Sequence, residues 1–468
     1  MTDRSASNVV LITVDSLRAD ALGDGASPTL DRLADEGVAF ENAVAHGNWT
    51  PFSFPSILGS RPVFDEGPAI GVASTPTLAE RLSEAGIATA GFNAANGFLT
   101  DHWGYDRGFD EFEPFVDSSG YSKYLAAHPT VQAWVQLGLS PFRRLATKLR
   151  GGDDDRPFAD VSRLTDIEDH ATGFVARTED RFFLWIHYMD THTPYVPAPR
   201  HLREVSDRRL GVARMLGSHL RTGLGWDVDE SRLATLRTLY DGTVRQVDES
   251  VSRILDALAA EGVADETAIV VAGDHGEEFL EHGHLAHYPK LYRELAEVPY
   301  FAFVPDGPSR QVTEPVGLDT VAPTVCELLG VDPAPAWAGQ STLPAFEGES
   351  IDDGPIVSVA VRGESITSQP IPRRRDDGEL LVSVRDDRFT YIEHTESGHH
   401  ELYDRRVDPG EQTDLSEADH DGVDTTAVAD RFSEIVADHV GALGDDVAAD
   451  EAEESDEIAA RLQALGYK

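Results

Sequence analysis

The sequence predicts an α/β fold in which helices flank a mostly parallel sheet and a small antiparallel sheet follows near the carboxyl terminus. Two observations support this prediction. Over the first three quarters of the chain, continuous apolar runs alternate with amphipathic helical patterns, as expected for a buried parallel sheet. After about residue 348, short strand-like runs are separated by polar turns, which favours antiparallel pairing.

Five apolar, β-branched runs are the expected strands of the main sheet. A strand that helices cover on both faces reads as a continuous apolar run, so each is expected to be a buried parallel strand. The runs lie at 8–14, 87–92, 182–187, 268–272 and 300–304.

Helical patterns lie between these runs. Residues 77–85 carry apolar side chains at helical spacing and end at Gly86, and residues 233–260 form a long amphipathic pattern. In the last quarter of the chain, strands are expected at 356–361, 379–384 and 389–393, and a covering helix at 426–440.

These patterns divide the chain into three expected parts. A catalytic domain occupies 1–350, a C-terminal α+β subdomain occupies 351–440, and an acidic tail occupies 441–468. A polar stretch at 151–156 is expected to be a surface loop.

The charge balance excludes some classes of partner. The chain has 83 acidic and 39 basic residues, for a formal net charge of -44. A polyanion of this kind repels a phosphate backbone and an anionic membrane surface, so nucleic acid and membrane docking are not expected.

The basic residues are nearly all arginine, and the lysines are Lys123, Lys148, Lys290 and Lys468. An acidic, lysine-poor surface is typical of halophilic archaea with a salt-filled cytoplasm, because it keeps a protein in solution when salt screens charge repulsion. The alternative is an acidic protein from ordinary salt.

Cys326 is the only cysteine of the sequence, which excludes an internal disulfide, and no apolar run is long enough for a membrane span. We therefore expect a cytoplasmic protein.

A carboxylate directly follows the first predicted strand. Asp15 comes after the run at 8–14, so we expect it at the carboxyl edge of the sheet, where α/β proteins bind ligands. The alternative reading of this segment alone is a helix N-cap, and the two stay open.

The predicted strand at 268–272 is also followed by polar residues. Asp274 and His275 lie between Gly273 and Gly276, and a carboxylate beside an imidazole at a strand-to-loop turn can bind one cation. The two glycines are expected to allow close approach of the backbone. A polar turn is the alternative, although Asp-His-Gly is an unusual combination for one.

A loop rich in Ser, Thr and Pro at 46–61 leads into an apolar helical start. A hydroxyl held on a metal ion is acidified and becomes a usable nucleophile at neutral pH. The alternative is a loop that only caps the helix.

Together, these three segments resemble the sulfatase family of the alkaline-phosphatase-like superfamily. Asp15 resembles the family's first metal position, Asp274-His275-Gly276 its second metal motif, and the loop at Thr50 its nucleophile segment. Other segments resemble later landmarks of the family in the same order, namely 104–110, 188–195, 281–299, 319–324 and 401–411. The resemblance therefore covers most of 8–415. The resemblance implies an alkaline-phosphatase-like fold and a metal-dependent hydrolase of sulfate or phosphate esters.

The nucleophile segment departs from that of true sulfatases, which oxidise a Cys or Ser in a Cys-x-Pro-x-Arg motif to formylglycine. Aligned through 56–60, Thr50 occupies the nucleophile position, Phe52 replaces the proline and Phe54 the arginine. Threonine here resembles the related phosphoglycerol and phosphoethanolamine transferases. Ser53 is the competing nucleophile, in a register that misplaces the end of the motif.

The resemblance also implies the other parts of the site. One divalent metal ion is expected on Asp15, Thr50, Asp274 and His275. Ca, Mg, Mn and Zn stay open, because Asp and His ligands suit each of them. His192 and His287 are expected to contact the substrate or protonate its leaving group, although a solvated loop histidine is the alternative for His287. Asn96 is a weaker candidate for the site, with Asn93 as its competitor.

The implied reaction forms a covalent ester on Thr50, which water or an acceptor alcohol resolves. The expected substrate is a small anionic ester: a sulfated or phosphorylated sugar, lipid or metabolite. One alternative is a transferase acting on a lipid or glycan head group, which the expected lack of a membrane span disfavours. Another is a non-catalytic binding protein, which the set of acidic and histidine residues disfavours.

Overall fold

The structure is a computed structural model that describes residues 6–23, 25–115, 163–206, 210, 212–223, 227–351, 354–362, 372–416 and 424–443. The surface loop expected at 151–156 and residues 444–468 of the acidic tail expected at 441–468 lie outside these ranges, and the division into three parts stays a prediction. Among the described helices, none combines the length and the hydrophobicity that a membrane crossing requires.

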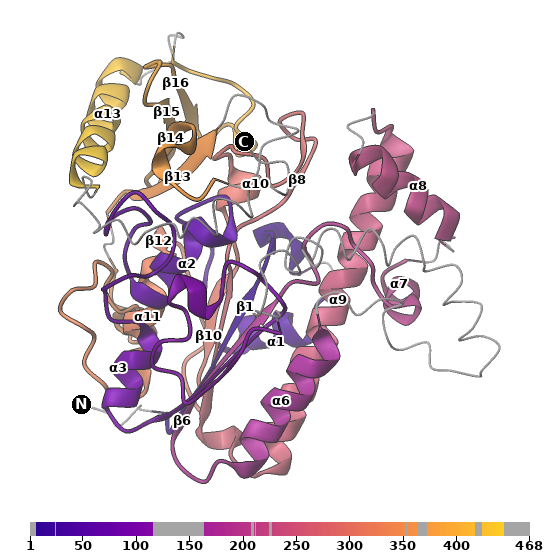
Figure 1. Ribbon diagram of the computed structural model, residues 1–468. Coiled ribbons are helices and arrows are strands. Elements are labelled where there is room, and N and C mark those ends of the chain that lie inside the picture. Colours follow the sequence, from indigo (N-terminus) through magenta and orange to yellow (C-terminus); the bar gives the residue numbers. More distant parts are fainter. Residues whose placement is uncertain are drawn as a thin grey trace, which may run out of the picture.

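A central sheet runs through the molecule (Figure 1). In the described chain its strand order is β11-β2-β10-β7-β1-β6-β4-β5, which starts with β11 (Arg310–Val312), β2 (Val38–Phe40) and β10 (Tyr300–Phe303). Its parallel part consists of β7 (Thr267–Gly273), β1 (Asn8–Val14), β6 (Phe182–Tyr188), β4 (Ala88–Asn93) and β5 (Glu111–Glu113). Because β1 lies between β7 and β6, the carboxyl ends of these three strands meet at one edge. The predicted fold class is confirmed.

One predicted strand runs in the other direction. The run at 300–304 forms β10 (Tyr300–Phe303), but it pairs antiparallel with both β7 and β2 (Val38–Phe40), so its expected parallel direction is wrong. The connection explains the difference. Residues 274–299 contain only β8 (Glu278–Phe279), β9 (Leu285–Ala286) and α10 (Arg293–Ala296), with no crossover helix to return the chain to the opposite edge.

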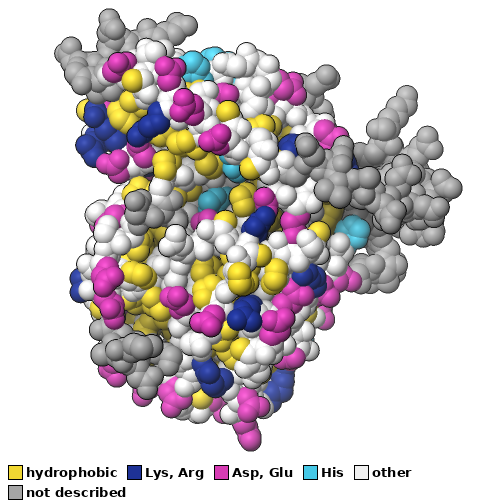
Figure 2. All heavy atoms as spheres, turned by 90° about the vertical axis from the view of Figure 1, so that its left-hand side faces the viewer, with side chains coloured by type: hydrophobic (Ala, Val, Ile, Leu, Met, Phe, Trp, Pro, Cys, Tyr) yellow, Lys and Arg dark blue, Asp and Glu magenta, His cyan; other side chains and the backbone are white. Residues whose placement is uncertain are grey.

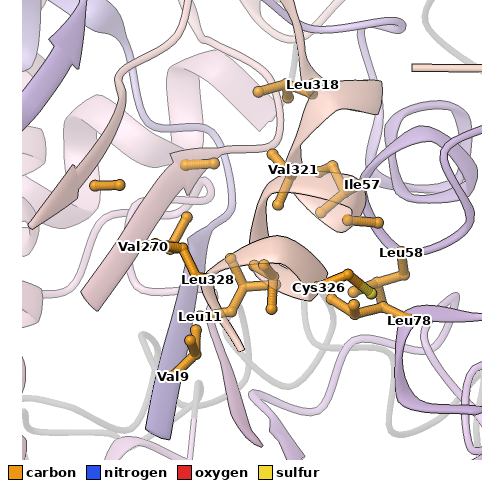
Figure 3. Close-up of a cluster of buried hydrophobic side chains, with 14 of the residues drawn as sticks. Val9, Leu11, Ile57, Leu58, Leu78, Val270, Leu318, Val321, Cys326 and Leu328 are labelled. Atoms are coloured by element: carbon orange, nitrogen blue, oxygen red, sulfur yellow. The ribbon is translucent and has the colours of Figure 1, made fainter. Parts of the chain in front are cut away.

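Helices cover both faces of the central sheet (Figure 1), and alternating side chains of β1 pack on one face or the other. Val9 and Leu11 belong to the core formed with α2 (Thr50–Gly59), α3 (Leu78–Glu84) and α11 (Val321–Leu328). Val10, Ile12 and Val14 belong to the core formed with α1 (Pro28–Glu36), α6 (Leu164–Arg177) and α9 (Glu230–Ala260). Cys326 is buried in the first core beside Leu58 and Leu78 (Figure 3), where its thiol is a packing group.

The remaining regular elements of the main unit are short or peripheral. They are β3 (Ala43–Val44), β11 (Arg310–Val312), β12 (Val316–Gly317), α7 (Pro199–Val205), α8 (Val212–Gly223) and α12 (Leu343–Phe346). The helix predicted at 77–85 is α3, and it begins with a capping box in which Thr77 and Glu80 satisfy each other's backbone N–H groups.

The small C-terminal sheet is an antiparallel meander of β13 (Ile356–Arg362), β14 (Glu379–Arg385), β15 (Phe389–His394) and β16 (His400–Asp404). The first three strands match the predicted runs, and β16 adds a strand that its polar sequence did not indicate. Helix α13 (Thr425–Ala442) covers the sheet through Phe432 and Val436. Phe52 of α2 packs into the same core, so this sheet lies against the helix that begins at Thr50.

A buried ion pair fastens the small sheet to the main unit. The guanidinium of Arg385, in β14, lies 2.9 Å from the carboxylate of Glu411, and both side chains are fully buried. The other oxygen of Glu411 accepts a hydrogen bond from the backbone N–H of Arg293, 2.7 Å away, at the start of α10. A single carboxylate therefore joins the small sheet to α10 of the main unit.

Candidate active site

Three neighbouring strands deliver polar side chains to one edge of the central sheet. Asp15 follows β1, Asp274 follows β7, and His187 is the penultimate residue of β6. All three side chains are buried, and one ligand atom from each lies within 4.8 Å of the other two. The edge therefore gathers two carboxylates and an imidazole from strands that are adjacent in space but far apart in sequence.

Thr50 meets these carboxylates from the start of α2. Its hydroxyl lies 2.9 Å from Asp274 Oδ2 and 3.1 Å from Asp15 Oδ2. As the first residue of the helix, it lies where the dipole of α2 favours negative charge. Ser53, its competitor, is buried one turn further along and donates its hydroxyl to the carbonyl of Gly47 at 3.1 Å. The structure thus brings Thr50 to the carboxylates, whereas Ser53 bonds elsewhere.

A strained residue holds the two carboxylates in place. Ser16 has a φ of 57°, in the left-handed region that a residue with a side chain rarely adopts. This conformation places its backbone N–H 3.1 Å from Asp274 Oδ1 and its hydroxyl 2.8 Å from Asp15 Oδ1. The Tyr240 hydroxyl, from α9, donates to the Ser16 carbonyl at 2.9 Å. Strain that surrounding contacts maintain is typical of functional sites.

The glycines around Asp274 are required by close packing, as predicted. A Cβ atom at Gly276 would lie 2.0 Å from the carbonyl oxygen of Glu294, and one at Gly273 would lie 2.7 Å from that of Leu17. Any side chain at either position would displace the backbone that carries Asp274.

Within the described chain, four imidazoles surround the carboxylates, and the protein holds the Nδ1 atom of each. Nδ1 of His187 lies 3.0 Å from Thr13 Oγ1, and Nδ1 of His287 lies 2.9 Å from Glu277 Oε2. The other two rings bond to backbone carbonyls: Nδ1 of His192 lies 2.6 Å from that of Thr193, and Nδ1 of His275 lies 2.8 Å from that of Gly276. With Nδ1 occupied, Nε2 is the nitrogen that each ring can offer to a ligand.

The rings form a continuous group beside the carboxylates. His275 Nε2 lies 3.6 Å from Asp15 Oδ1, and His187 Nε2 lies 4.0 Å from Asp15 Oδ2. The His287 ring lies 4.9 Å from that of His275 and 4.8 Å from that of His192, measured between centroids. The proposed metal and substrate histidines are therefore next to one another.

Burial and neighbouring charges set the protonation of this cluster. Burial raises the pKa of the Asp274 carboxyl, and the nearby Asp15 carboxylate raises it further. Burial also opposes ionisation of Asp15, but the imidazoles of His192 and His275 outweigh it and hold the pKa of Asp15 below its ordinary value. Burial lowers the pKa of His187 to about 4, so this ring is neutral at pH 7.

The donor set fits a divalent cation. Two carboxylates and a neutral imidazole are ligands for such ions, and a neutral His is the form that binds metal. Among the described residues, the ion-pair partners of Asp15 and Asp274 are imidazoles rather than Arg or Lys. His187 Nε2 is buried and has no hydrogen-bond partner within the described chain, which is costly unless a ligand uses it.

The structure brings together all the residues that the sequence pointed to: Asp15, Thr50, Asp274, His275, His192 and His287. It also places Asn96 there, with Nδ2 3.3 Å from Asp15 Oδ2, whereas the Asn93 amide bonds to the Leu99 carbonyl. Two neighbours of the site, His187 and Glu277, were not predicted. An imidazole at the end of an apolar run could have indicated His187, but only the fold reveals that Glu277 reaches His287.

Comparisons with known proteins agree with this geometry. The family model described as Sulfatase matches residues 7–331, which include every site residue named above. Choline-sulfatase of Rhizobium meliloti is 25% identical over 474 residues, covering 92% of this chain and 86% of that protein. Delta 4,5-hexuronate-2-O-sulfatase of Bacteroides thetaiotaomicron is 28% identical over 208 residues, covering 43% of this chain and 39% of that protein. The crystal structure of the phosphonate monoester hydrolase of Agrobacterium radiobacter has the same fold, with a TM-score of 0.68 at 19% identity, and covers 94% of this chain and 96% of that one.

Proposed function

Because this chain belongs to the sulfatase family and is a hydrolase of sulfuric or phosphoric esters, we propose that it cleaves a small anionic ester through a covalent intermediate on unmodified Thr50. The observation that supports this most directly is the Thr50 hydroxyl, which lies between Asp15 and Asp274 at the start of α2. A hydroxyl between two buried carboxylates is well placed to bind a cation together with them.

In this proposal one divalent cation is held by Asp15, Asp274, the Thr50 hydroxyl and an imidazole. His275 and His187 are the imidazoles within reach, with Nε2 3.6 Å and 4.0 Å from Asp15 oxygens. When bound, the cation acidifies the hydroxyl and neutralises charge on the group being transferred.

The chain's own residues perform the remaining steps. Thr50 Oγ1 attacks sulfur or phosphorus, and the bond to the leaving oxygen breaks as the new ester bond forms. His192 and His287 offer Nε2; one of these nitrogens takes up the proton that Thr50 releases, and this proton then goes to the leaving oxygen. Water then attacks the Thr50 ester, releases the inorganic anion and restores the hydroxyl.

The relatives support a sulfate or phosphorus ester as the class of substrate, but they differ in the ester that their names give. Proteins named choline-sulfatase and Delta 4,5-hexuronate-2-O-sulfatase support a sulfate ester of a metabolite or sugar, and the phosphonate monoester hydrolase supports a phosphorus ester. We propose a sulfated or phosphorylated sugar, lipid or metabolite. Threonine as nucleophile favours a second candidate, a phospho-group transferase in which an acceptor alcohol, rather than water, resolves the Thr50 ester.

The test is to quench turnover and locate the adduct by mass spectrometry. The protein is incubated with metal ions and with 4-nitrophenyl sulfate, phosphate or phenylphosphonate, and the adduct is expected on the peptide that contains Thr50. Thr50→Ala is expected to remove the adduct and nearly all turnover, whereas Thr50→Ser, which keeps the hydroxyl, retains both. Ser53→Ala is the matched control and should have a mild effect. An adduct on Ser53, or formylglycine at position 53, would overturn the proposal.

A further inference from the structure

We propose that Glu277 is a positioning residue: its carboxylate fixes the orientation and tautomer of His287, so that Nε2 of this ring serves the leaving group of the ester. This inference rests on the proposed function, and it assigns a task to a side chain outside the predicted site.

The carboxylate of Glu277 is held at both oxygens. Glu277 is fully buried, its Oε2 lies 2.9 Å from His287 Nδ1, and its Oε1 accepts a hydrogen bond from the Tyr195 hydroxyl. The Tyr195 ring packs against those of Tyr240 and Phe279, with centroids 5.5 and 5.8 Å away, so the second bond comes from a ring that is itself fixed.

The backbone of Glu277 is also fixed. Its N–H donates to the Glu294 carbonyl at 2.9 Å, and its own carbonyl accepts from Arg18 Nη1 at 2.6 Å. A buried carboxylate held at its backbone and at both oxygens has little freedom to follow a moving partner. The imidazole that donates to it therefore takes the orientation that the carboxylate sets.

His287 differs from the other imidazoles of the site in the partner of its Nδ1. His187, His192 and His275 bond there to a hydroxyl or a carbonyl, whereas His287 bonds to a carboxylate. A carboxylate can only accept, so Nδ1 carries the hydrogen and Nε2 is left to face a reactant. A charge-assisted bond is also stronger than one to a neutral acceptor, particularly when the ring carries a positive charge.

The backbone of His287 is tied to the nucleophile segment. The indole Nε1–H of Trp49 donates to the His287 carbonyl at 2.6 Å, and Trp49 immediately precedes Thr50. With its backbone anchored beside the nucleophile and its Nδ1 anchored on Glu277, the ring has one remaining reactive atom, Nε2. Loss of the carboxylate would leave His287 in place but allow its ring to turn and its tautomer to exchange.

The first test compares esters that differ only in the leaving group. Aryl esters of whichever acid the wild type hydrolyses are made with phenols from 4-nitrophenol to phenol, and kcat/KM is measured for wild type and Glu277→Gln. A poor leaving group needs a proton more than a good one, and proton donation contributes about 10²–10⁴-fold. We expect Glu277→Gln to lose at least about tenfold more on the phenyl ester than on the 4-nitrophenyl ester.

Two controls separate positioning from a structural role. Glu278→Gln alters the adjacent buried carboxylate, which accepts hydrogen bonds from the backbone N–H groups of His282 and His284 rather than from a site imidazole. This variant should change kcat/KM by the same factor for every ester. In a His287→Gln background, Glu277→Gln should add no further leaving-group dependence, because the two residues act as a unit. An equal loss on every ester, or the same dependence in Glu278→Gln, would overturn the inference.

The second test does not depend on activity. The nitrogen-15 spectrum of labelled histidine reports the tautomer of each ring, and the His287 signals are identified by their loss in His287→Gln. Wild type should show the Nδ1–H form, and Glu277→Gln should show a mixture of both forms; identical spectra would refute the positioning role. If the wild type hydrolysed none of the esters, the proposed function would fail, and the spectra would still decide the role of Glu277.

Discussion

Two imidazoles lie within reach of the proposed cation at the edge of the central sheet. His275 approaches both carboxylates, with Nε2 3.6 Å from Asp15 Oδ1 and 3.8 Å from Asp274 Oδ1. His187 is slightly further away, but it is neutral because of burial and its Nε2 has no other partner in the described chain. Either nitrogen can complete a ligand set of carboxylates and a hydroxyl, and substitution can distinguish them.

At this scale we expect Asp274→Ala to abolish cation binding and activity in a folded protein, because the carboxylate faces Asp15, Thr50 and His275. His187→Ala should weaken binding of Mn²⁺ or Zn²⁺ by at least about tenfold, because even the loss of a residue that only orients a metal ligand commonly costs about 10–100-fold in affinity. Calorimetric titration and metal analysis after dialysis measure both effects. His170→Ala, an exposed histidine of α6, is the control. Full metal occupancy in Asp274→Ala would eliminate the proposed site.

At the scale of elements, Glu411 stabilises the packing of the small sheet against α10. Burial opposes its ionisation, but the Arg385 guanidinium and the Thr390 hydroxyl outweigh burial and hold the pKa of Glu411 below its ordinary value. The same residue bonds to the N–H of Arg293, beside the loop that carries His287. The small sheet and α10 are thus connected through one ionised carboxylate.

We expect Glu411→Gln to reduce the free energy of unfolding by about 3 kcal/mol at pH 7, because among the described residues it leaves the buried Arg385 guanidinium with only the Glu297 carboxylate, 3.6 Å away, as an ion-pair partner. A carboxyl with a lowered folded pKa stabilises the fold above its unfolded pKa, about 4.3, and loses this effect as the pH falls through the folded pKa. The difference between wild type and variant should therefore be full above about pH 5 and shrink below about pH 4. Denaturant unfolding at several pH values measures it. Glu396→Gln, in the exposed turn between β15 and β16, should change little, and a difference that did not vary with pH would contradict this account.

The elements differ in how far they could be predicted. Apolar runs mark β1, β6 and β7 because these strands are buried on both faces, and Asp15 and Asp274 follow from the position of a carboxylate at a strand end. The direction of β10 could not be predicted in the same way, since an apolar run is identical in either direction and only the connection decides it. His187 and Glu277 were not predicted for a related reason. The sequence pattern does not show that His187 lies beside Asp15 and Asp274, which are distant in the chain, or that the turn after β7 brings Glu277 to His287.

At the scale of the whole molecule, the dominant quantity is the net charge of -44. Acidic side chains are spread over the face shown in Figure 2, from the region of the small sheet to the opposite end. Charges of one sign repel one another across a compact surface, and salt screens this repulsion over a Debye length of about 10 Å at 0.1 M and about 3 Å at 1 M. We propose on this basis that the protein works in concentrated salt.

The melting temperature should accordingly rise steeply between dilute and molar KCl, because screening removes self-repulsion from the folded state. Differential scanning calorimetry over a series of KCl concentrations measures the effect. Sucrose at matched osmolality is the control, since it is excluded from the protein surface but screens no charge. Equal melting temperatures in dilute and molar KCl would remove the case for a halophilic protein.

The order of strands has a consequence for how the protein is made. β1 is synthesised before β6 and β7, yet it pairs with β6 on one side and β7 on the other, and the Asp15 carboxylate that follows it meets partners at positions 187 and 274. A growing chain therefore holds Asp15 and Thr50 long before it can assemble the cluster, and capture of the proposed cation must wait until β7 and Asp274 have left the ribosome. Until then β1 is an apolar strand without its neighbours, a state prone to aggregation. Uptake of the proposed cation would thus mark completion of the sheet as far as β7, and any product cut short before Asp274 is expected to be inactive and a target for proteolysis.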